Sequence, residues 1–432
     1  MKQLLIIAWL NLIQHRRRSL MLGGAIAGAT ALLVFLTCLS SGVKATMMKS
    51  ATTVATGHIN VGGFYKITAG QSAPLVTDYQ KIEGIVKATL PDLDYVTSRG
   101  RGWSRLVSDE GNMQVGIAGV DLENEPKLPK VLKIVTGKYE DLKNAGSILI
   151  FESQAKKLKV KVGDSMVFSV LTPRGVNNTV DVRVVAIAED MGLMSSWNVF
   201  VPNVTLRQLY QLNPSSTGAI LVYVKDMAKI NADIDLLRAA LSKAGYQVMD
   251  RDPKAFWMKL QSVAREDWTG QKLDLTSWED EISWAMWALK GIDGLSVLLT
   301  TVLLVIIAVG IMNAMWIAIR ERTREIGTLR AIGMQRRWVL IMFVLETFFL
   351  GVLGTAAGSV LGSLAAGAIH LMHLHVPEGA QFFTMSSTLQ FSFEPSRIVT
   401  SSIVITLCMT LVSIIPSFKA ARMKPVTAMS HL

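Results

Sequence analysis

Residues 321–337 read ERTREIGTLRAIGMQRR, and the rest of the sequence is organised around this short basic stretch. Together with Arg320 before it, the stretch holds six arginines and two glutamates. Long apolar runs flank it on both sides, residues 295–319 before it and 339–369 after it. A basic segment between two such runs is typical of a tight turn between two membrane spans.

Apolar residues recur at three-residue steps inside the stretch. Ile326, Leu329 and Ile332 would form an apolar ridge on a short helix that also carries Arg324 and Arg330. Such a helix, held at the membrane face, suits docking into a groove of a partner protein. The charge alone leaves a second interpretation open, in which the stretch only anchors and orients the chain.

Three segments of the stretch follow a distinctive order: Glu321-Arg322, Arg324-Glu325-Ile326-Gly327 and Leu329-Arg330-Ala331-Ile332-Gly333. This order resembles the cytoplasmic loop of the FtsX-like permeases of ABC transporters, which include the MacB exporters and the lipoprotein-releasing (Lol) permeases. In that family the loop is the coupling helix that sits on the ATPase subunit. The resemblance therefore implies ATPase contact for eight residues: Arg322, Arg324, Glu325, Ile326, Gly327, Leu329, Arg330 and Gly333.

The net charge of +11 sits in short segments at the ends of apolar runs. Residues 1–18 carry +4, residues 320–337 carry +4 and the tail 417–432 carries +3, which accounts for the whole excess. This is the positive-inside pattern of a membrane protein, and it places all three segments in the cytoplasm. It also argues against a nucleic-acid partner, whose binding would need a basic patch on a folded domain.

Four membrane spans are predicted from the apolar runs. The first span and its stalk cover residues 19–55, a second stalk and span cover 278–320, and spans three and four cover 338–370 and 398–416, where Pro416 is expected to end the last one. A helix from Arg18 to Ala55 would extend about 55 Å and one from Ile282 to Arg320 about 58 Å, whereas a bilayer core is about 30 Å thick. Both helices would therefore continue beyond the membrane as paired stalks.

Residues 56–277 are polar and mixed, which predicts a large α+β domain outside the cytoplasm. Strand and helix patterns repeat in β-α-β order, with strands at 58–67 and 219–224 and helices at 78–90 and 227–244. Between about residues 125 and 200 the strand signals are denser. The arrangement resembles a MacB-type periplasmic domain, in which a β-rich subdomain is inserted into a porter-like core, and residues 371–397 add a second outer loop.

Several residues inside the spans are candidates for helix packing. Asn313 and Glu346 are polar residues that membrane helices use for hydrogen bonds between helices. A carboxylate inside a span could instead serve proton or substrate chemistry, but helix packing is preferred for Glu346. Small residues allow close helix approach, and four glycines of span three are predicted to do so: Gly351, Gly354, Gly358 and Gly362. The spacing of His370, His373 and His375 could hold a metal, but no acidic or thiol partner is clustered with them, so we predict no metal site.

The fold class predicted is thus a membrane α-helical protein with four transmembrane helices and a large α+β extracytoplasmic domain. No catalytic constellation stands out and the phosphate-binding pattern Gly-x4-Gly-Lys-Ser/Thr is absent from the 432 residues, so ATP and magnesium are expected on a separate ATPase chain. The resemblance also implies a second permease copy or paralogue, and leaves a periplasmic chaperone or adaptor as a further partner.

The resemblance offers three functions for such a permease in the inner (cytoplasmic) membrane. Lipoprotein release is preferred, because residues 55–61 (ATGHINV) and 275–278 (LTSW) look more Lol-like than MacB-like. MacB-type export of a drug, peptide or toxin is the second function. A non-transporting regulator of the FtsX type, which transmits motion only, is the third, and the large two-part outer domain counts against it.

Overall fold

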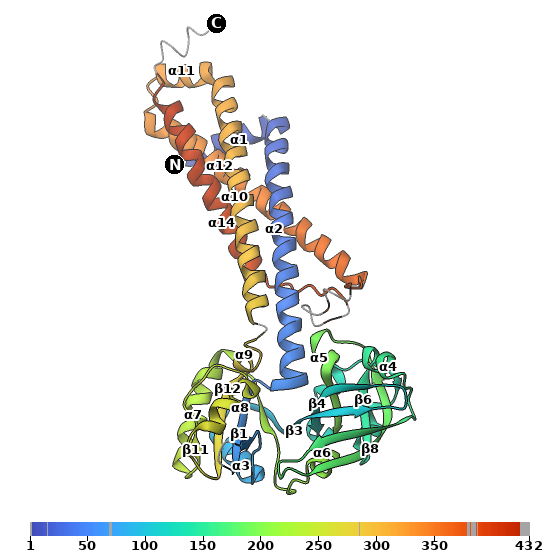
Figure 1. Ribbon diagram of the computed structural model, residues 1–432. Helices are drawn as coiled ribbons and strands as arrows, with labels where there is room; N and C mark the ends of the chain where they lie inside the picture. Colours follow the sequence, from blue (N-terminus) through green and yellow to red (C-terminus); the bar gives the residue numbers. More distant parts are fainter. Residues whose placement is uncertain are drawn as a thin grey trace. The chain divides into compact units, whose positions relative to one another are not determined.

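The computed structural model describes residues 2–14, 16–68, 71–284, 286–377, 381, 386 and 388–423 (Figure 1). The chain divides into two compact units. The helical unit comprises residues 1–44, 290–374 and 389–432, and the sheet unit comprises residues 45–289 and 375–388. Residues 424–432 of the predicted cytoplasmic tail lie outside the described part.

The helical unit is built from long apolar helices. In chain order its helices are α1 (Lys2–Gln14), α2 (Arg16–Ala51), α10 (Met286–Glu321), α11 (Thr323–Ala331), α12 (Arg336–Leu371) and α14 (Pro395–Ala421). Four segments are long and apolar enough to cross a membrane: Ser19–Thr56, Lys290–Glu321, Arg336–Leu371 and Pro395–Ala421. The four predicted spans are therefore confirmed by length and composition.

Two predicted helix boundaries in this group were wrong. The second stalk does not run on from Ile282, because α9 (Trp278–Glu281) is a separate turn of helix capped by Ser277 and Asp280, and α10 begins only at Met286. Pro416 does not end the fourth span, since α14 continues to Ala421. Proline is tolerated inside membrane helices, where neighbouring helices and polar side chains can satisfy the backbone groups that it frees.

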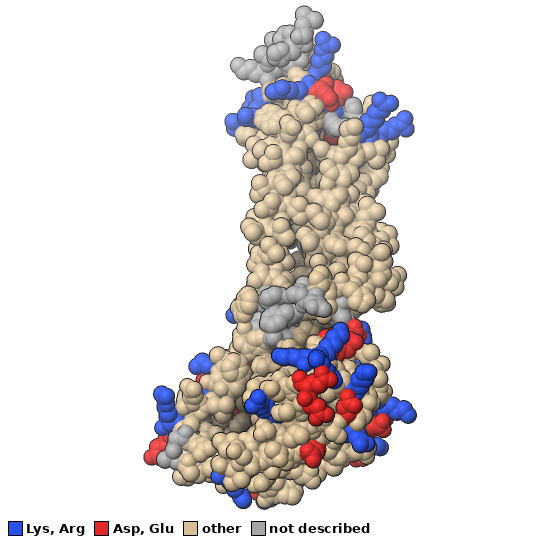
Figure 2. Space-filling view, turned by 45° about the vertical axis from the view of Figure 1, so that its right-hand side comes forward, with Lys and Arg blue, Asp and Glu red and all other residues tan. Residues whose placement is uncertain are grey.

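Charged side chains of the helical unit gather at one end, as expected for a membrane protein. In Figure 2 most of the length of this unit carries no acidic or basic side chain, and Lys and Arg gather at the end that holds α11. The exposed basic residues there include Arg324, Arg336 and Arg337. Its buried core joins α1, α2, α10, α11, α12 and α14 through residues such as Leu12, Ile326 and Val339.

The sheet unit contains one continuous sheet of 12 strands in the described part, in the order β11-β12-β1-β10-β3-β4-β9-β6-β8-β5 with β2 and β7 alongside. The strands are β1 (Ile59–Thr68), β2 (Gln71–Ala73), β3 (Leu93–Val107), β4 (Asn112–Val120), β5 (Ile134–Gly137), β6 (Ser147–Phe151), β7 (Ser165–Leu171), β8 (Asn177–Ala188), β9 (Asn198–Pro202), β10 (Ala219–Val224), β11 (Gln247–Val248) and β12 (Gln271–Ser277). A π-helical turn, Thr52–Thr56, joins α2 to β1.

The long strand β3 belongs to both parts of this sheet. Its first half pairs with β10, while residues from Gly100 onward pair with β4 and then β7. The β-rich part therefore begins inside β3, well before the predicted boundary near residue 125, and its strands extend to β9 at residues 198–202. A strand shared by both parts leaves no linker whose composition could mark the boundary.

Helices cover the sheet on its two parts. The porter-like part is covered by α3 (Tyr79–Thr89) and α7 (Ile230–Lys243), whose Ile82, Val86 and Leu237 pack on β1 and β10. The β-rich part has α4 (Glu152–Leu158), α5 (Leu193–Trp197) and α6 (Asn203–Tyr210), and α8 (Phe256–Arg265) packs beside β1. The predicted strand, helix, strand order of the porter-like part is confirmed.

Candidate functional site

The turn between α10 and α12 contains the predicted short helix, α11. It runs from Thr323 to Ala331, and Gly333 just beyond its end has a φ of +104°, a left-handed conformation that favours glycine. The amide of Gly333 donates to the carbonyl of Arg330 and the amide of Met334 to that of Leu329, so the last turn is closed by backbone hydrogen bonds. Gly333 therefore fixes the direction in which the chain turns back into α12.

The apolar ridge predicted on this helix is divided between two faces. Ile326 is only 1% exposed and packs into the core of the helical unit with Leu12 and Val339, so it cannot fill a groove on a partner. Gly327 is also buried and Leu329 is partly buried. The prediction that Ile326 contacts an ATPase was wrong, because its own bundle offers the apolar surface that it needs. Ile332, by contrast, is 80% exposed.

The outward face of α11 is therefore mixed rather than apolar. Arg324, Glu325 and Thr328 are exposed along it, and Ile332 follows at its end. We call these four residues the α11 face. Arg330 is partly committed within the chain, because its Nη1 donates to the carbonyl of Met334 at 3.0 Å. An exposed isoleucine beside charges of both signs is a surface suited to a complementary protein partner.

Arg322 points inward instead of toward a partner. Its side chain is 3% exposed, and Nη1 lies 3.0 Å from Oε2 of Glu346, which is itself 4% exposed. The expectation that Arg322 contacts an ATPase was wrong for this reason: a buried guanidinium needs a buried carboxylate, and α12 supplies one. The pair fastens the junction of α10 and α11 to α12.

The four glycines of α12 lie at close helix contacts. A Cβ atom at Gly354 would lie 2.7 Å from Cγ2 of Ile26, and one at Gly362 would lie 2.5 Å from the carbonyl oxygen of Ala31, both on α2. Gly351 faces Thr406 of α14 at 3.3 Å. Backbone contact of this kind holds α2, α12 and α14 together where lipid gives no hydrophobic driving force.

Substitution of Gly358 by alanine is expected to destabilise the helical unit. The new Cβ would lie 2.5 Å from the carbonyl oxygen of Ala27 and 2.6 Å from Cβ of Thr30, so the helices must separate. Overpacking of this kind costs about 1–3 kcal/mol. The midpoint of detergent-induced unfolding measures the change. Gly310→Ala is the control, because no atom lies within 4 Å of its Cβ position. Equal midpoints for both variants would show that the Gly358 contact is not tight.

Asn313 differs from its predicted packing role, whereas His370 lies beside Phe391 and His373. Asn313 is exposed on α10 and so does not pack inside this chain. The backbone amide of Phe391 donates to Nδ1 of His370 at 3.4 Å, and the rings of His370 and His373 are 6.4 Å apart. Among the described residues, no group of three or more His, Cys, Asp or Glu side chains could hold a metal.

Sequence reasoning missed a second set of polar contacts, at the end of α2. Arg99 on β3 is 2% exposed and donates to Oε1 of Glu125 and to the carbonyls of Thr53 and Val54. The hydroxyl of Tyr223 donates to the carbonyl of Thr52 at 2.9 Å. The carbonyls of Thr53 and Val54 at this helix end are thus bonded to the sheet, while that of Thr52 also accepts from the amide of Gly57. The sequence signal for this set of contacts was an arginine inside a predicted strand.

Four membrane-length helices, a charged turn between two of them and a large α+β unit define a multi-span membrane protein with an extracytoplasmic domain. A model of the FtsX-like permease C-terminal domain matches residues 297–425. The macrolide export ATP-binding/permease protein MacB of Nitrobacter winogradskyi is 24% identical over 96% of this chain and 58% of its own length. An uncharacterized ABC transporter permease of Methanocaldococcus jannaschii, MJ0797, is 29% identical over 46% of this chain and 50% of its own.

Residues 297–425 thus carry the FtsX-like permease C-terminal domain, and the chain is similar to ABC transporter permeases over most of its length. It spans less than two thirds of the length of these curated relatives. Among solved structures, the extracellular domain of the noncanonic ABC-type transporter YknZ from Gram-positive bacteria covers 43% of this chain and 95% of its own, with 15% identity and a TM-score of 0.31.

Proposed function

We propose that this chain is the permease subunit of an ABC transporter in the inner (cytoplasmic) membrane. In this proposal it converts ATP hydrolysis by a separate ATPase chain into motion of its extracytoplasmic sheet unit, and its cargo is a lipoprotein that leaves the membrane. The observation that carries the proposal is the α11 face, which is exposed on one side and fastened on the other by the Arg322–Glu346 pair. A load applied to Arg324 or Glu325 would therefore be passed to α10 and α12.

Two features support transmission of that motion. Helix α2 is uninterrupted from Arg16 to Ala51, a length of about 54 Å. Its continuation ends on bonds from Arg99 and Tyr223 of the sheet unit. A helix resists bending better than a loop, so α2 suits the role of a lever. The ion pair between Lys44 of α2 and Asp293 of α10 links the two stalk helices.

The preference for lipoprotein release rests on the two Lol-like segments, 55–61 and 275–278. These segments meet in the fold, because Ile59, Asn60 and Val61 of β1 pair with Ser277, Thr276 and Leu275 of β12. Because the two Lol-like segments are paired strands, their resemblance to the Lol permeases concerns one local structure. Both strands adjoin the segments that lead to α2 and α10.

Export of a drug or peptide is the second candidate. It is favoured by the extent of the likeness to the macrolide export protein of Nitrobacter winogradskyi, which covers 96% of this chain. The third candidate, a non-transporting regulator, accounts less well for a sheet unit with two elaborate parts. In each case the ATPase, carrying ATP and magnesium, is expected to bind the α11 face, and a second permease copy or paralogue completes the complex. A periplasmic chaperone would accompany release, and an adaptor would accompany export.

Glu325→Lys is expected to lower transport-coupled ATP hydrolysis by about tenfold while the chain still inserts in the membrane. The carboxylate is exposed on the α11 face, and reversing its charge would oppose a basic group on the ATPase. ATP hydrolysis by the reconstituted complex measures the effect. Asp109→Lys in the sheet unit is the control, since it makes the same change far along the chain from α11. Unchanged coupled hydrolysis in Glu325→Lys would reduce the stretch to a membrane anchor.

Copurification under mild conditions tests the proposed partners and cargo together. The chain is extracted in nanodiscs, and bound proteins and lipids are identified by mass spectrometry. We expect an ABC ATPase, a permease copy or paralogue, and acylated protein. A bound small molecule with an adaptor protein, and no acylated protein, would replace lipoprotein release with export. Recovery without any ATPase would contradict the permease assignment itself.

A further inference from the structure

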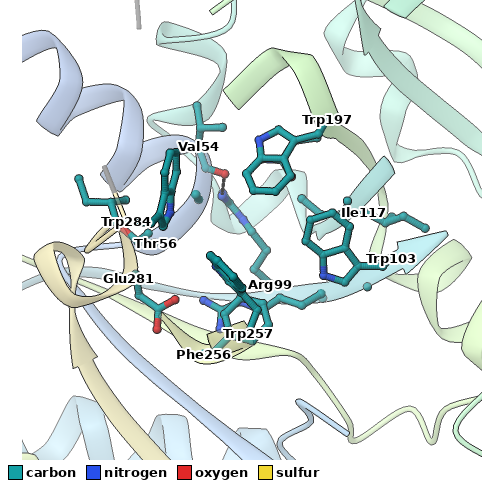
Figure 3. A pocket seen from close by; sticks show the side chains of 18 residues that line it. Val54, Thr56, Arg99, Trp103, Ile117, Trp197, Phe256, Trp257, Glu281 and Trp284 are labelled. Atoms are coloured by element: carbon teal, nitrogen blue, oxygen red, sulfur yellow. Dashed lines mark hydrogen bonds between the residues drawn. The ribbon is translucent and has the colours of Figure 1, made fainter. Parts of the chain in front are cut away.

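The sheet unit contains a small aromatic pocket of about 110 Å³ (Figure 3). It lies where β3 and β4 meet α8, the end of α5 and the residues around α9. Four tryptophans and one phenylalanine form its walls: Trp103, Trp197, Trp257, Trp284 and Phe256. The volume is close to that of a cavity which holds a single benzene-sized ring, about 150 Å³.

The aromatic walls are arranged around the space and reach its opening. The ring centroids of Trp103 and Trp197 are 5.2 Å apart, and those of Trp197 and Trp284 are 6.2 Å apart at nearly a right angle. Trp103 is 43% exposed and Trp257 is 38% exposed, so both are accessible to solvent. Rings at these separations present faces and edges to an incoming aromatic group.

Two hydrogen-bond donors line the pocket without an acceptor. Among the described residues, the guanidinium of Arg101 makes no hydrogen bond or ion pair and lies over the ring of Phe256, 4.3 Å from its centroid. The indole Nε1 of Trp197 is buried and has no hydrogen-bond partner within the described chain. Arg99 differs sharply, because its guanidinium bonds to Glu125 and to two backbone carbonyls.

The carboxylates near Arg101 are engaged elsewhere. Asp274 accepts two hydrogen bonds from Nζ of buried Lys259, at 3.0 and 2.9 Å, and Oε1 of Glu281 accepts from Thr276 at 2.7 Å. Burial lowers the pKa of Arg101, and the attraction of Glu281 and Asp274 does not offset it. The cation is thus incompletely neutralised by its own chain. A partly buried cation without a charged partner is costly, as is the buried, unpaired Nε1 of Trp197, and an anionic ligand would relieve both costs.

We propose that this pocket binds a small aromatic carboxylate. The ring lies among the indoles of Trp103, Trp197 and Trp284, and the carboxylate accepts hydrogen bonds from Arg101 and from Nε1 of Trp197. The volume limits the bound group to about one ring, so larger substituents extend past Trp103 and Trp257 into solvent. This binding does not depend on the proposed cargo, and it is measured without ATP or an ATPase.

Equilibrium dialysis of radiolabelled 3-phenylpropionate against the full chain in nanodiscs tests the proposal, with empty nanodiscs subtracted. We expect saturable binding, and at least about tenfold weaker binding of the matching alcohol, 3-phenylpropanol, which lacks the charge-assisted hydrogen bond. Arg101→Gln should weaken 3-phenylpropionate binding about tenfold or more. Trp197→Phe keeps a ring and removes the donor, so it should weaken binding several-fold.

Arg105→Gln is the matched control. Arg105 lies on the same strand, is exposed and bonds to Asn112 outside the pocket, so binding should be unchanged. Thermal unfolding of each variant shows whether it is folded, and Trp197→Phe provides an independent test if Arg101→Gln is not. Absence of saturable binding, or equal affinity for the acid and the alcohol, would overturn the proposal. So would equal affinity in folded Arg101→Gln and the native chain.

Discussion

Arg322→Met alone is expected to destabilise the helical unit by about 3–5 kcal/mol, because it removes the guanidinium that pairs with the buried carboxylate of Glu346. The double variant Arg322→Met/Glu346→Leu removes both charges and keeps similar volumes. It should recover most of the loss, since a well-packed apolar pair often replaces a buried ion pair at little cost. The midpoint of detergent-induced unfolding is measured for the native chain, both single variants and the double variant.

The control for this series is Arg324→Met, two residues further along and exposed on the α11 face. Its stability should stay close to native, while its coupled ATP hydrolysis falls. A double variant as unstable as Arg322→Met would show that the pair is not the cause. A stable Arg322→Met variant would show that the ion pair with Glu346 does not fasten α11 to α12.

Insertion of Gly-Gly-Pro between Val43 and Lys44 is expected to stop substrate movement while ATP hydrolysis persists. The insertion breaks α2 within its 36 residues and also displaces Lys44 from Asp293, but it leaves α11 and the sheet unit unaltered. If α2 transmits motion to the sheet unit, a break in this helix uncouples ATP hydrolysis from movement of the cargo. ATP turnover and release of cargo are measured on the same reconstituted sample.

The same tripeptide inserted after Arg174 is the control, because that residue lies in an exposed turn between β7 and β8. Both activities should survive there. If cargo still moves after α2 is broken, the helix only tethers the sheet unit and does not transmit motion. Loss of ATP hydrolysis together with movement would show that the insertion damages assembly, and a break in α10 between Gly291 and Ile292 would then decide whether any stalk helix transmits motion.

The spans and most strands could be predicted because each depends on a local pattern. An apolar run long enough for a bilayer is read directly from the sequence, as for α12, and the short run of β-branched and aromatic residues in β10 marks it as a strand. The close approach of Gly354 and Gly362 to α2 also follows a local rule, since four-residue spacing places small residues on one face. None of these features needs knowledge of a distant contact.

The parts that could not be predicted depend on residues far apart in the chain. Periodicity shows that Ile326 belongs to an apolar ridge, but not that Leu12 and Val339 cover it. An arginine such as Arg322 is usually exposed on the surface. Its burial becomes favourable only through Glu346, 24 positions later in the chain. The aromatic pocket likewise collects Arg101, Trp197 and Trp284 from three separate segments. The spacing of these residues in the sequence does not predict that their side chains lie together in the fold.

We propose that ATP hydrolysis moves an acylated protein out of the membrane through this chain. The most direct measurement reconstitutes the complex in proteoliposomes with a triacylated protein and with the same protein lacking its acyl chains. The account predicts ATP-dependent appearance of the acylated protein in the soluble fraction when a carrier is supplied, and no such release after the break in α2. ATP-driven efflux of a macrolide, with the acylated protein left in the membrane, would contradict it.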